Sequence, residues 1–428
     1  MIRYVEKPVS VKEALERIKS VAKPVSETLT LPTWEAIGRV LSKDVEAPYD
    51  FPPRPRSAYD GYAVRSEDTP GKLRVVGESP LGVVNVRLRV EPGAAVYVST
   101  GAFLPDGADT VVPEEAAKLE GDHIVVEREF KPGKNVDPVG FYCKRGQLLL
   151  REGYVVTIFD AVSLLNVAVT RVEVYRPVRV AIVATGSEIF DLGDVSPEEA
   201  ERRILRGEVA ETTAKLVEWA LKRYTPWTDI VARILLPDHL DTVSWHIERR
   251  FTNADLIVLT GGTGPSTVDL FYQLGETLGG EVLFRGLAVR GGRPTSALAL
   301  PDGRLLLALS GHPISAFHGF LRLLYPALRY LGNVKRSGEV PVVFDAELLK
   351  SVEPGRPRPI KVKLQLSDGR LYAEPLPRER QLSSVVVSNV EADGIVLVEG
   401  RGYEAGDRAP VFVYREPERR EITGGEKR

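Results

Sequence analysis

The sequence has few oxidisable residues and no long apolar run. Cysteine occurs once, as Cys143, and methionine only at position 1. A single cysteine excludes an internal disulfide framework and a multi-cysteine metal site, so Cys143 is expected to be a buried or incidental thiol. No apolar run approaches the roughly 20 residues that a membrane helix needs, and the N-terminal stretch lacks the apolar core of a signal peptide. We therefore expect a cytoplasmic protein with no membrane partner.

Neither sign of charge dominates. The chain has 57 lysines and arginines against 59 acidic residues, a net charge of −2, and the two signs are interspersed. No large basic face is implied, so nucleic acid is not an expected partner. The 31 prolines, with the scarcity of cysteine and methionine, fit a heat-loving source. At roughly 100–200 residues per domain, 428 residues predict two to four domains.

The first 142 residues combine a helical start with short strands. Ser10 and Glu13 have the spacing of a capping box, and apolar residues then recur at helical spacing, which predicts a helix over 11–22. A second helix is expected over 32–41. Residues 49–71 are rich in proline, aspartate and aromatics without an amphipathic period, which indicates a functional loop. Short β-branched runs between turn residues predict β structure over 72–142.

From Val178 the pattern alternates between strand and helix. Buried strands are expected at 179–185, 230–236 and 255–260, and helices at 208–223, 239–250, 268–278 and 313–331, with Asp238 capping the second helix. A hairpin is expected around Asp302-Gly303. This alternation predicts a mostly parallel sheet covered by helices on both faces. Beyond Gly338, short strands separated by turns predict a small barrel or sandwich.

Three glycine-containing loops follow strands of the expected sheet. They are Thr185-Gly186-Ser187-Glu188, Gly261-Gly262-Thr263-Gly264 and Ser310-Gly311-His312-Pro313. Ligands of open α/β sheets bind outside the carboxyl ends of the strands, and glycines let backbone N–H groups approach an anion. The alternative is that each glycine only makes a tight turn. Three such loops at one edge favour a phosphate site.

Charged residues accompany these loops. Glu188 and Asp269 could hold a divalent cation such as Mg²⁺ beside a phosphate, although Asp269 could equally be a favourable charge at a helix N-terminus. Asp238 is fully explained by helix capping. Arg290 and Arg293 flank two glycines and could grip an oxyanion, or could simply be solvated. His312 and His318 have no partner at ligand spacing, so a zinc site is not expected.

The order of several motifs resembles the molybdopterin molybdenumtransferase family, which includes MoeA and the E domain of gephyrin. The matching segments are RSAYDGYAV (56–64), STGAFLPDGADTVVPEE (99–115), VATGSEI (183–189), DLIVLTGGTGPSTVD (255–269), VRGGRPTSALAL (289–300) and ALSGHPISA (308–316). Their order and spacing match from near residue 5 to near residue 414.

The resemblance implies a multidomain α/β plus β chain with four domains. These are a helical and extended linker domain (1–48 and 143–176), an inserted β domain (49–142), a molybdopterin-binding α/β domain (177–333) and a C-terminal β-barrel (334–428). The family forms elongated homodimers with each active site between subunits. The implied activity is insertion of molybdate into adenylylated molybdopterin with release of AMP, assisted by Mg²⁺ or another divalent cation. Tungstate could replace molybdate.

By position, the resemblance also implies site residues. Asp60, Thr100, Glu188, Asp238 and Asp269 match polar residues that are important in the family. Arg290 and Arg293 stand where the family usually has two lysines, and Lys361 and Ser383 align with an arginine and a serine near the molybdate. The substrate-binding set then comprises Gly186, Ser187, Gly261, Gly262, Thr263, Gly264, Arg290, Arg293, Ser310, Gly311, His312, Lys361 and Ser383, with Glu188 and Asp269 as metal ligands.

The chain departs from the family pattern at four places: 141–142, 211–213, 261–264 and 310–313. The Gly261–Gly264 segment is closer to proteins that adenylylate molybdopterin, which supports an adenylyltransferase as an alternative. The replacement of an acidic pair by Phe141-Tyr142, and of Asp-Ser-Asn by Glu-Thr-Thr at 211–213, supports a non-catalytic pterin-binding paralogue as the other. We therefore carry three hypotheses: a molybdate insertase, an adenylyltransferase and a binding protein.

Overall fold

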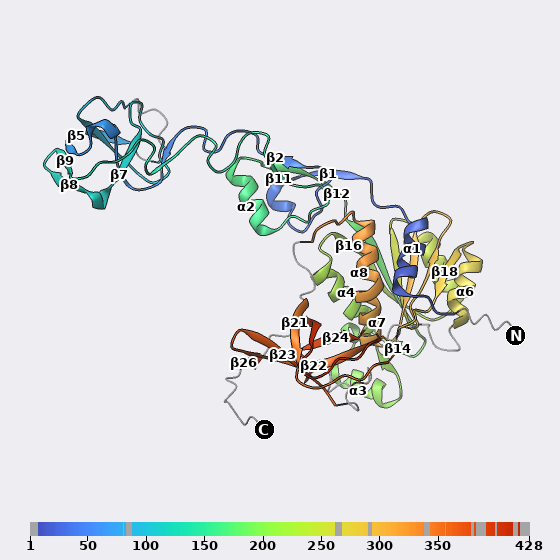
Figure 1. Cartoon of the computed structure of the whole chain (residues 1–428). Helices are drawn as coiled ribbons and strands as arrows, with labels where there is room; N and C mark the ends of the chain where they lie inside the picture. Colours follow the sequence, from blue (N-terminus) through green and yellow to red (C-terminus); the bar gives the residue numbers. More distant parts are fainter. Residues whose placement is uncertain are drawn as a thin grey trace, which may run out of the picture. The chain divides into compact units, whose positions relative to one another are not determined.

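The computed structural model describes residues 7–79, 81–82, 88–261, 268–289, 293–337, 343–355, 357–377, 381, 391–398, 400–413 and 418–419. The chain divides into two compact units (Figure 1). The first comprises Met1–Ser42, Glu152–Thr157 and Glu173–Arg428, and the second comprises Lys43–Arg151 and Ile158–Val172. The four finer domain ranges expected from the sequence stay predictions. Within the described ranges, no helix has both the length and the apolarity that spanning a membrane requires.

A six-stranded sheet lies at the centre of the first unit. Its strand order is β16-β13-β17-β20-β19-β18. The first four strands are parallel. Strand β19 is antiparallel to β20, as the predicted hairpin requires, and β18 is antiparallel to β19. The strands are β13 (Val178–Thr185), β16 (Thr228–Leu236), β17 (Leu256–Gly261), β18 (Glu281–Arg285), β19 (Ser296–Ala299) and β20 (Leu305–Leu309). The mostly parallel sheet predicted from the sequence is thus confirmed.

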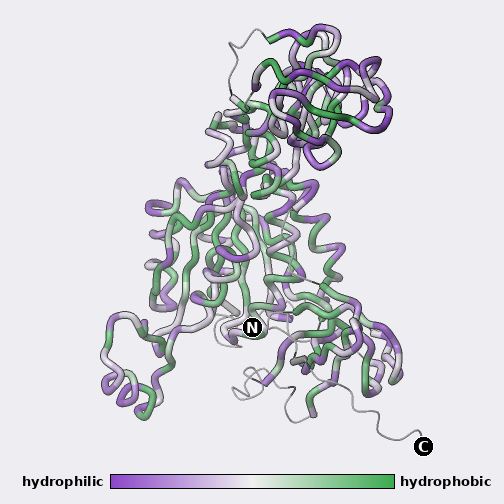
Figure 2. Tube along the Cα trace, turned by 90° about the vertical axis from the view of Figure 1, so that its left-hand side faces the viewer, coloured by the Kyte–Doolittle hydropathy of each residue, from purple (hydrophilic) through white to green (hydrophobic). Residues whose placement is uncertain are grey.

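Helices cover both faces of this sheet because its strands are apolar on both sides. Along β13, Val180 and Ile182 pack with α1, α4, α7 and α8, whereas Ala181 and Val183 pack with α5 and α6. Figure 2 shows the hydrophobic colour concentrated along these strands. The helices are α1 (Val11–Val21), α4 (Thr213–Tyr224), α5 (Leu240–Arg249), α6 (Val268–Thr277), α7 (Pro313–Gly319) and α8 (Tyr325–Leu331).

The C-terminal part forms a five-stranded barrel. The order β23-β21-β25-β24-β22 closes through an additional β22–β23 pairing, and β26 (Glu418–Arg419) adds to β22. The strands are β21 (Val343–Leu348), β22 (Arg358–Ser367), β23 (Arg370–Pro375), β24 (Gly394–Val398) and β25 (Arg408–Val413). Phe412 packs against Tyr224 of α4 and Phe317 of α7, with ring centroids 5.7 and 5.6 Å apart. The barrel therefore shares a core with the helices that cover the sheet.

The second unit is mainly β. A six-stranded sheet has the order β7-β4-β6-β5-β9-β8, and two short pairs, β3–β10 and β2–β11, lie outside it. The elements are β2 (Val45–Glu46), β3 (Arg56–Ser57), β4 (Gly61–Val64), β5 (Gly71–Ser79), β6 (Ala94–Val98), β7 (Thr110–Pro113), β8 (Ala117–Glu120), β9 (His123–Val126), β10 (Val136–Asp137), β11 (Leu148–Leu150) and α2 (Ile158–Asn166). Cys143 is buried in a small cluster with Ala47 and Val167, as expected for a structural thiol.

The helix predicted over 32–41 is wrong. Only the 3₁₀ turn η1 (Thr33–Glu35) forms between β1 (Thr28–Pro32) and an extended stretch in which Val40 pairs with Val155. Gly38 has a φ of +81°, and a Cβ there would lie 2.9 Å from Pro226. A left-handed residue cannot continue an α-helix, so the segment turns and pairs instead.

Three other boundaries differ from the sequence expectations. The helix predicted from 208 begins at Thr213, because residues 209–210 form β15 and pair with β14 (Ile189–Phe190). Helix α3 (Pro197–Leu205), capped by Ser196, was not predicted. The helix predicted over 313–331 contains a π segment at Phe320–Leu324, next to Pro326, which has no N–H to donate.

The packing between the barrel and the helices can be tested by replacing a buried aromatic side chain with alanine. Replacing the 3% exposed Phe412 by alanine should lower the free energy of unfolding by about 3–5 kcal/mol, because a large buried ring is lost. Phe344 of β21 serves as the control. It is the register partner of Val411, the neighbour of Phe412, but it is 50% exposed, so Phe344→Ala should lower the free energy of unfolding by less than about 1 kcal/mol. Urea unfolding measures both, and equal losses would contradict the shared core.

Candidate functional site

The carboxyl ends of three parallel strands meet at one edge of the central sheet. Thr185 at the end of β13 is in register with Gly261 at the end of β17, and Thr260 is in register with Leu309 at the end of β20. The loops that carry Gly186, Gly261 and Gly311 therefore begin side by side, and we call this edge the glycine rim. The sequence predicted their convergence, and the parallel register confirms it.

Two glycines are required by close contacts within this rim. Gly261 has a φ of +90°, and a Cβ there would lie 2.2 Å from the carbonyl oxygen of Thr185. A Cβ on Gly311 would lie 3.3 Å from the Cα of Gly261. The backbones at Gly261, Thr185 and Gly311 therefore approach one another with no room for a side chain between them.

Two buried hydroxyls and the N-termini of two helices also lie at this edge. The hydroxyls of Thr185 and Thr260 are buried and have no hydrogen-bond partner in the described part of the chain. Helix α7 begins at Pro313 directly after the third loop, and α4 begins at Thr213, whose hydroxyl donates to the carbonyl of Gly311 at 2.6 Å. The N-termini of two helices therefore open at the rim, where their dipoles favour an anion.

Asp238 does not cap α5, contrary to the sequence interpretation. His239 occupies the N-cap position without a side-chain cap, and Asp238 instead accepts a 2.7 Å hydrogen bond from the Ser187 hydroxyl. This bond joins the loop after β16 to the loop after β13. Glu188 is exposed, and its carboxylate lies 3.0 Å from where a Cβ of Gly186 would stand. Glu188 thus lies in the first glycine loop, and Asp238 is joined to that loop through Ser187.

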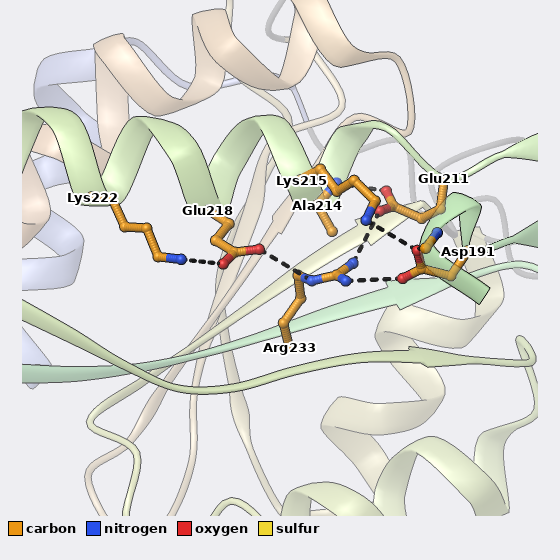
Figure 3. Close-up of polar contacts among 8 residues, drawn as sticks. Asp191, Glu211, Ala214, Lys215, Glu218, Lys222 and Arg233 are labelled. Carbon is orange, nitrogen blue, oxygen red and sulfur yellow. Dashed lines mark hydrogen bonds and ion pairs between the residues drawn. The ribbon is translucent and has the colours of Figure 1, made fainter.

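A cluster of charged side chains lies beside the rim, centred on Arg233 of β16 (Figure 3). Its guanidinium contacts Asp191 at 2.9 Å, Glu218 at 3.1 Å and Glu211 at 3.7 Å. Asp191 directly follows β14, and Glu211 directly follows β15, so one arginine reaches the ends of both paired strands. Because β14 begins at Ile189, the cluster also anchors the turn that carries Glu188.

Two lysines and a helix cap complete this cluster. Lys215 pairs with Asp191 at 3.0 Å, and Lys222 pairs with Glu218 at 2.5 Å. Glu211 is 4% exposed, and its Oε1 accepts the N–H of Ala214 at 2.6 Å in the first turn of α4. The backbone N–H of Gly193, together with Lys215 and Arg233, lowers the pKa of Asp191 to about 2. The carboxylate is therefore charged at any physiological pH.

In the sequence, Glu211 stands out only as a departure from the family pattern, and Arg233 belongs to no motif. An arginine within a strand of otherwise apolar residues was the available signal, because a charge at such a position needs partners when it is partly buried.

In the second unit, Asp60 and Thr100 lie together. The carboxylate of Asp60 accepts the backbone N–H of Thr100 at 2.8 Å, and the carbonyl of Asp60 accepts the N–H of Glu114 at 3.1 Å. A Cβ on Gly61 would lie 2.2 Å from the carbonyl oxygen of Val112, which explains the glycine after Asp60. The two motifs that the sequence analysis treated separately thus form one surface feature.

Two neighbours of this pair were not predicted. The Tyr97 hydroxyl donates to Glu114 at 3.2 Å, and desolvation, Glu114 and Asp60 together raise the pKa of Tyr97. Glu114 belongs to the Pro-Glu-Glu end of the second motif, which was the signal available. Asp60 and Glu114 therefore form an exposed acidic surface beside β6 and β7.

Lys361 comes from the barrel and not from one of the glycine loops. It is 4% exposed in β22 and lines a cavity between the barrel, α4 and α7, and burial lowers its pKa. His318 of α7 is nearby and 3% exposed, and burial, with Arg322 and Lys361, lowers its pKa to about 3. His318 is therefore neutral, and neither ring nitrogen has a hydrogen-bond partner among the described residues.

Several predicted site residues lie outside the described residues: Gly262, Thr263, Gly264, Arg290 and Ser383. The same holds for the side chain of Asp269, whose backbone is in α6. Arg293, Ser310 and His312 are described, and His312 is the N-cap residue of α7. Among the described residues, no three His, Cys, Asp or Glu side chains are grouped as a metal site. The predicted roles of these residues stay predictions.

Three family profiles match consecutive parts of the chain. The MoeA N-terminal region (domain I and II) matches residues 9–168, a probable molybdopterin binding domain matches 181–330, and the MoeA C-terminal region (domain IV) matches 349–414. Together they follow one another in the order expected from the sequence motifs.

Individual proteins agree over nearly the full length. A molybdopterin molybdenumtransferase of Staphylococcus epidermidis is 27% identical over 417 residues, and one of Staphylococcus aureus is 29% identical over 418 residues, each covering 95% of this chain and 96% of the relative. The solved structure of the molybdopterin biosynthesis MoeA protein from Pyrococcus horikoshii OT3 has a TM-score of 0.77 at 27% identity, covering 95% of this chain and 100% of that one.

The charged cluster can be tested at its centre. Arg233→Met should lower the free energy of unfolding by about 3–5 kcal/mol, because it leaves the buried Glu211 carboxylate without its cation. Lys222→Met, which removes only an exposed lysine of the same cluster, should cost less than about 1 kcal/mol.

The pH dependence provides a second measurement. Asp191 has a folded pKa below its ordinary 3.8, so its contribution is complete above that pH and is lost as pH falls towards 2. In Arg233→Met the pKa of Asp191 should rise, and stability should fall less over that interval than in the unaltered protein. Identical slopes in urea unfolding between pH 4 and 2 would contradict the role of Arg233.

Proposed function

Because the chain belongs to the MoeA family of molybdopterin molybdenumtransferases, as its motifs predicted, we propose that it inserts molybdate or tungstate into adenylylated molybdopterin and releases AMP. The expectation that the protein works in the cytoplasm as a soluble biosynthetic enzyme is part of the same proposal.

The observation that carries this proposal is the glycine rim. Adenylylated molybdopterin contains a pyrophosphate link, whose oxygens need donors that are fixed in place before the substrate binds. The touching backbones at Gly261 and Gly311, the buried hydroxyls of Thr185 and Thr260, and two helix N-termini offer such donors at one edge. We infer that the pyrophosphate lies across this edge, with its charge towards the start of α7.

The acids of the rim suit a divalent cation. Glu188 is exposed at the rim, and no hydrogen-bond partner within the described residues competes for its carboxylate, so it fits as an oxygen ligand of Mg²⁺. We propose Asp269 as the second ligand. Such a cation, when bound, would offset the charge that develops on the departing AMP phosphate. Asp238 would hold Ser187, and with it the Glu188 turn, in position.

The remaining predicted residues complete the proposal. Arg290, Arg293 and Ser383 would bind the molybdate dianion, for which bidentate guanidinium groups are suited. We propose the same role for Lys361, as the family resemblance implies. Asp60 and Thr100 are proposed to contribute to the reaction through the surface that they form with Glu114.

The assay is AMP release from adenylylated molybdopterin in the presence of molybdate and Mg²⁺. Glu188→Gln should raise the Mg²⁺ concentration for half-maximal release by about tenfold or more, because a charged ligand is lost. Glu198→Gln, an exposed acid of α3, serves as the control and should leave the Mg²⁺ dependence unchanged. An unchanged Mg²⁺ dependence in Glu188→Gln would remove Glu188 from the metal site.

The same assay separates the three hypotheses. No AMP release above background, with tight pterin binding retained, would favour the non-catalytic binding protein. ATP-dependent adenylylation of bare molybdopterin would favour the adenylyltransferase. Molybdate-dependent AMP release without ATP is the outcome that we expect.

We also propose that the protein is a homodimer, and that the exposed face of α2 contributes to its interface. Ile158, Phe159 and Val162 are 59%, 78% and 58% exposed, and Leu165 one turn later is 37% exposed. An apolar stripe of this kind on one short helix is typical of an association surface, and a second copy is the partner that the family resemblance implies.

Charge placed on this face should weaken the dimer. Phe159→Asp should shift the protein to monomers at micromolar concentration, because an ionised carboxylate would be buried in the interface. Leu119→Asp alters an equally exposed apolar residue, 62% exposed on β8, and should leave the dimer intact. Light scattering after size-exclusion chromatography measures both, and a dimeric Phe159→Asp would exclude α2 from the interface.

A further inference from the structure

Two of the four segments in which the chain departs from its family are in direct contact. They are residues 211–213, at the start of α4, and residues 310–313, the third glycine loop. The Thr213 hydroxyl donates to the carbonyl of Gly311 at 2.6 Å, across 98 positions of sequence. Thr213 is 5% exposed, so this hydrogen bond is shielded from water. The two departures are therefore joined by one short hydrogen bond.

The helical turn that carries Thr213 is fixed from below by a charged side chain. Oε1 of Glu211 accepts the N–H of Ala214 at 2.6 Å, which caps the first turn of α4 (Figure 3). Oε2 of the same carboxylate lies 3.7 Å from the guanidinium of Arg233. Strand β16 thus supports, through one carboxylate, the turn from which Thr213 donates.

The backbone that accepts this bond has little freedom to move. A Cβ on Gly311 would lie 3.3 Å from the Cα of Gly261, so the third loop is packed closely against the second. The carbonyl of Gly311 and the N–H of His312 belong to one planar peptide group, so a bond that fixes the carbonyl also fixes the direction of that N–H. The N–H donates to the Ser310 hydroxyl at 3.2 Å. One rigid peptide group therefore connects Thr213 to Ser310.

The proton of the Ser310 hydroxyl is available to a ligand. Its Oγ accepts from His312, and a hydroxyl that accepts a hydrogen bond can still donate its own proton, which no group in the described part of the chain accepts. Ser310 is 6% exposed, whereas Gly311 and His312 beside it are exposed. An oxyanion at the rim would meet a hydroxyl whose orientation is already restricted, so less freedom of rotation is lost on binding.

We propose that Thr213 is a positioning residue of the anion site, which acts through the Gly311–His312 peptide to direct the Ser310 hydroxyl towards a phosphate oxygen of the substrate. This inference rests on the proposed function, in which the pyrophosphate of the substrate lies across the glycine rim. It gives the two changed segments a common role, because one hydroxyl positions the other. The changes at 211–213 then preserve substrate binding.

Inorganic pyrophosphate with Mg²⁺ is the first probe, because its binding to the full chain requires neither pterin nor turnover. Thr213→Val replaces the hydroxyl by a methyl group of similar size, and it should weaken pyrophosphate binding by about tenfold in isothermal titration calorimetry. Thr213→Ser keeps the hydroxyl and should bind within about threefold of the unaltered protein. Equal affinity of Thr213→Val and the unaltered protein would overturn the proposal, as would an unaltered protein that does not bind pyrophosphate.

Thr225→Val is the matched control. The Thr225 hydroxyl lies at the other end of α4, is fully buried, and donates to the carbonyl of Leu221 at 2.8 Å. Its loss should lower stability to an extent similar to Thr213→Val, as urea unfolding measures, but should leave pyrophosphate affinity unchanged. If both variants weakened pyrophosphate binding equally, the effect would come from a general loss of stability, and Thr213 would have no positioning role.

A double variant tests whether Thr213 acts through Ser310. Ser310→Ala should weaken pyrophosphate binding by about tenfold, because a donor is lost. Adding Thr213→Val to Ser310→Ala should weaken it further by less than about twofold, since the hydroxyl that Thr213 positions is already absent. Two independent losses that multiply to about a hundredfold would contradict action through Ser310.

AMP release from adenylylated molybdopterin separates this inference from the proposed function. Thr213→Val should raise the KM for adenylylated molybdopterin by about tenfold. It should leave the Mg²⁺ concentration for half-maximal release unchanged, because Glu188 is unaltered. An unaltered protein that binds pyrophosphate in a Thr213-dependent way but releases no AMP would refute molybdate insertion and support the positioning role. AMP release with the same KM in Thr213→Val would refute the positioning role and support insertion.

Discussion

The site depends on the close approach of three backbone segments at the carboxyl edge of the central sheet. The parallel register of β13, β17 and β20 brings the ends of these strands together, and Gly261 fits between them because it has no Cβ. The same contact leaves hydroxyls buried without partners and places the first turns of α4 and α7 beside it. The packing of the strand ends is therefore the structural basis of the proposed anion site.

The charged cluster around Arg233 connects the segments beside this rim through ion pairs. Carboxylates that follow β14 and β15 share one guanidinium with Glu218 of α4, so the Glu188 turn is tied to the edge strand and to a helix at once. Three cationic and three anionic side chains pair within the cluster, and this pairing offsets the cost of burying the Glu211 carboxylate. The replacement of Asp by Glu at position 211 is accommodated, because the longer side chain both caps α4 and faces Arg233.

The barrel packs against the α/β domain through aromatic side chains. Phe412 contacts Tyr224 of α4 and Phe317 of α7, and both of these residues also line the cavity that contains Lys361. This junction thus fixes the position of the barrel against the helices and leaves Lys361 4% exposed.

The sequence by itself determined the family, the alternation that builds a mostly parallel sheet, and the three glycine loops, because apolar periodicity and glycine positions report local structure directly. It did not determine the role of Asp238, the partners of Arg233 or the surroundings of Lys361. The sequence favoured capping for Asp238, and the structure gives it Ser187 instead. Contacts between residues tens to hundreds of positions apart depend on strand register and on domain packing, which only the tertiary structure fixes. The helix wrongly expected over 32–41 has the same cause: pairing of Val40 with Val155 outweighed the local pattern.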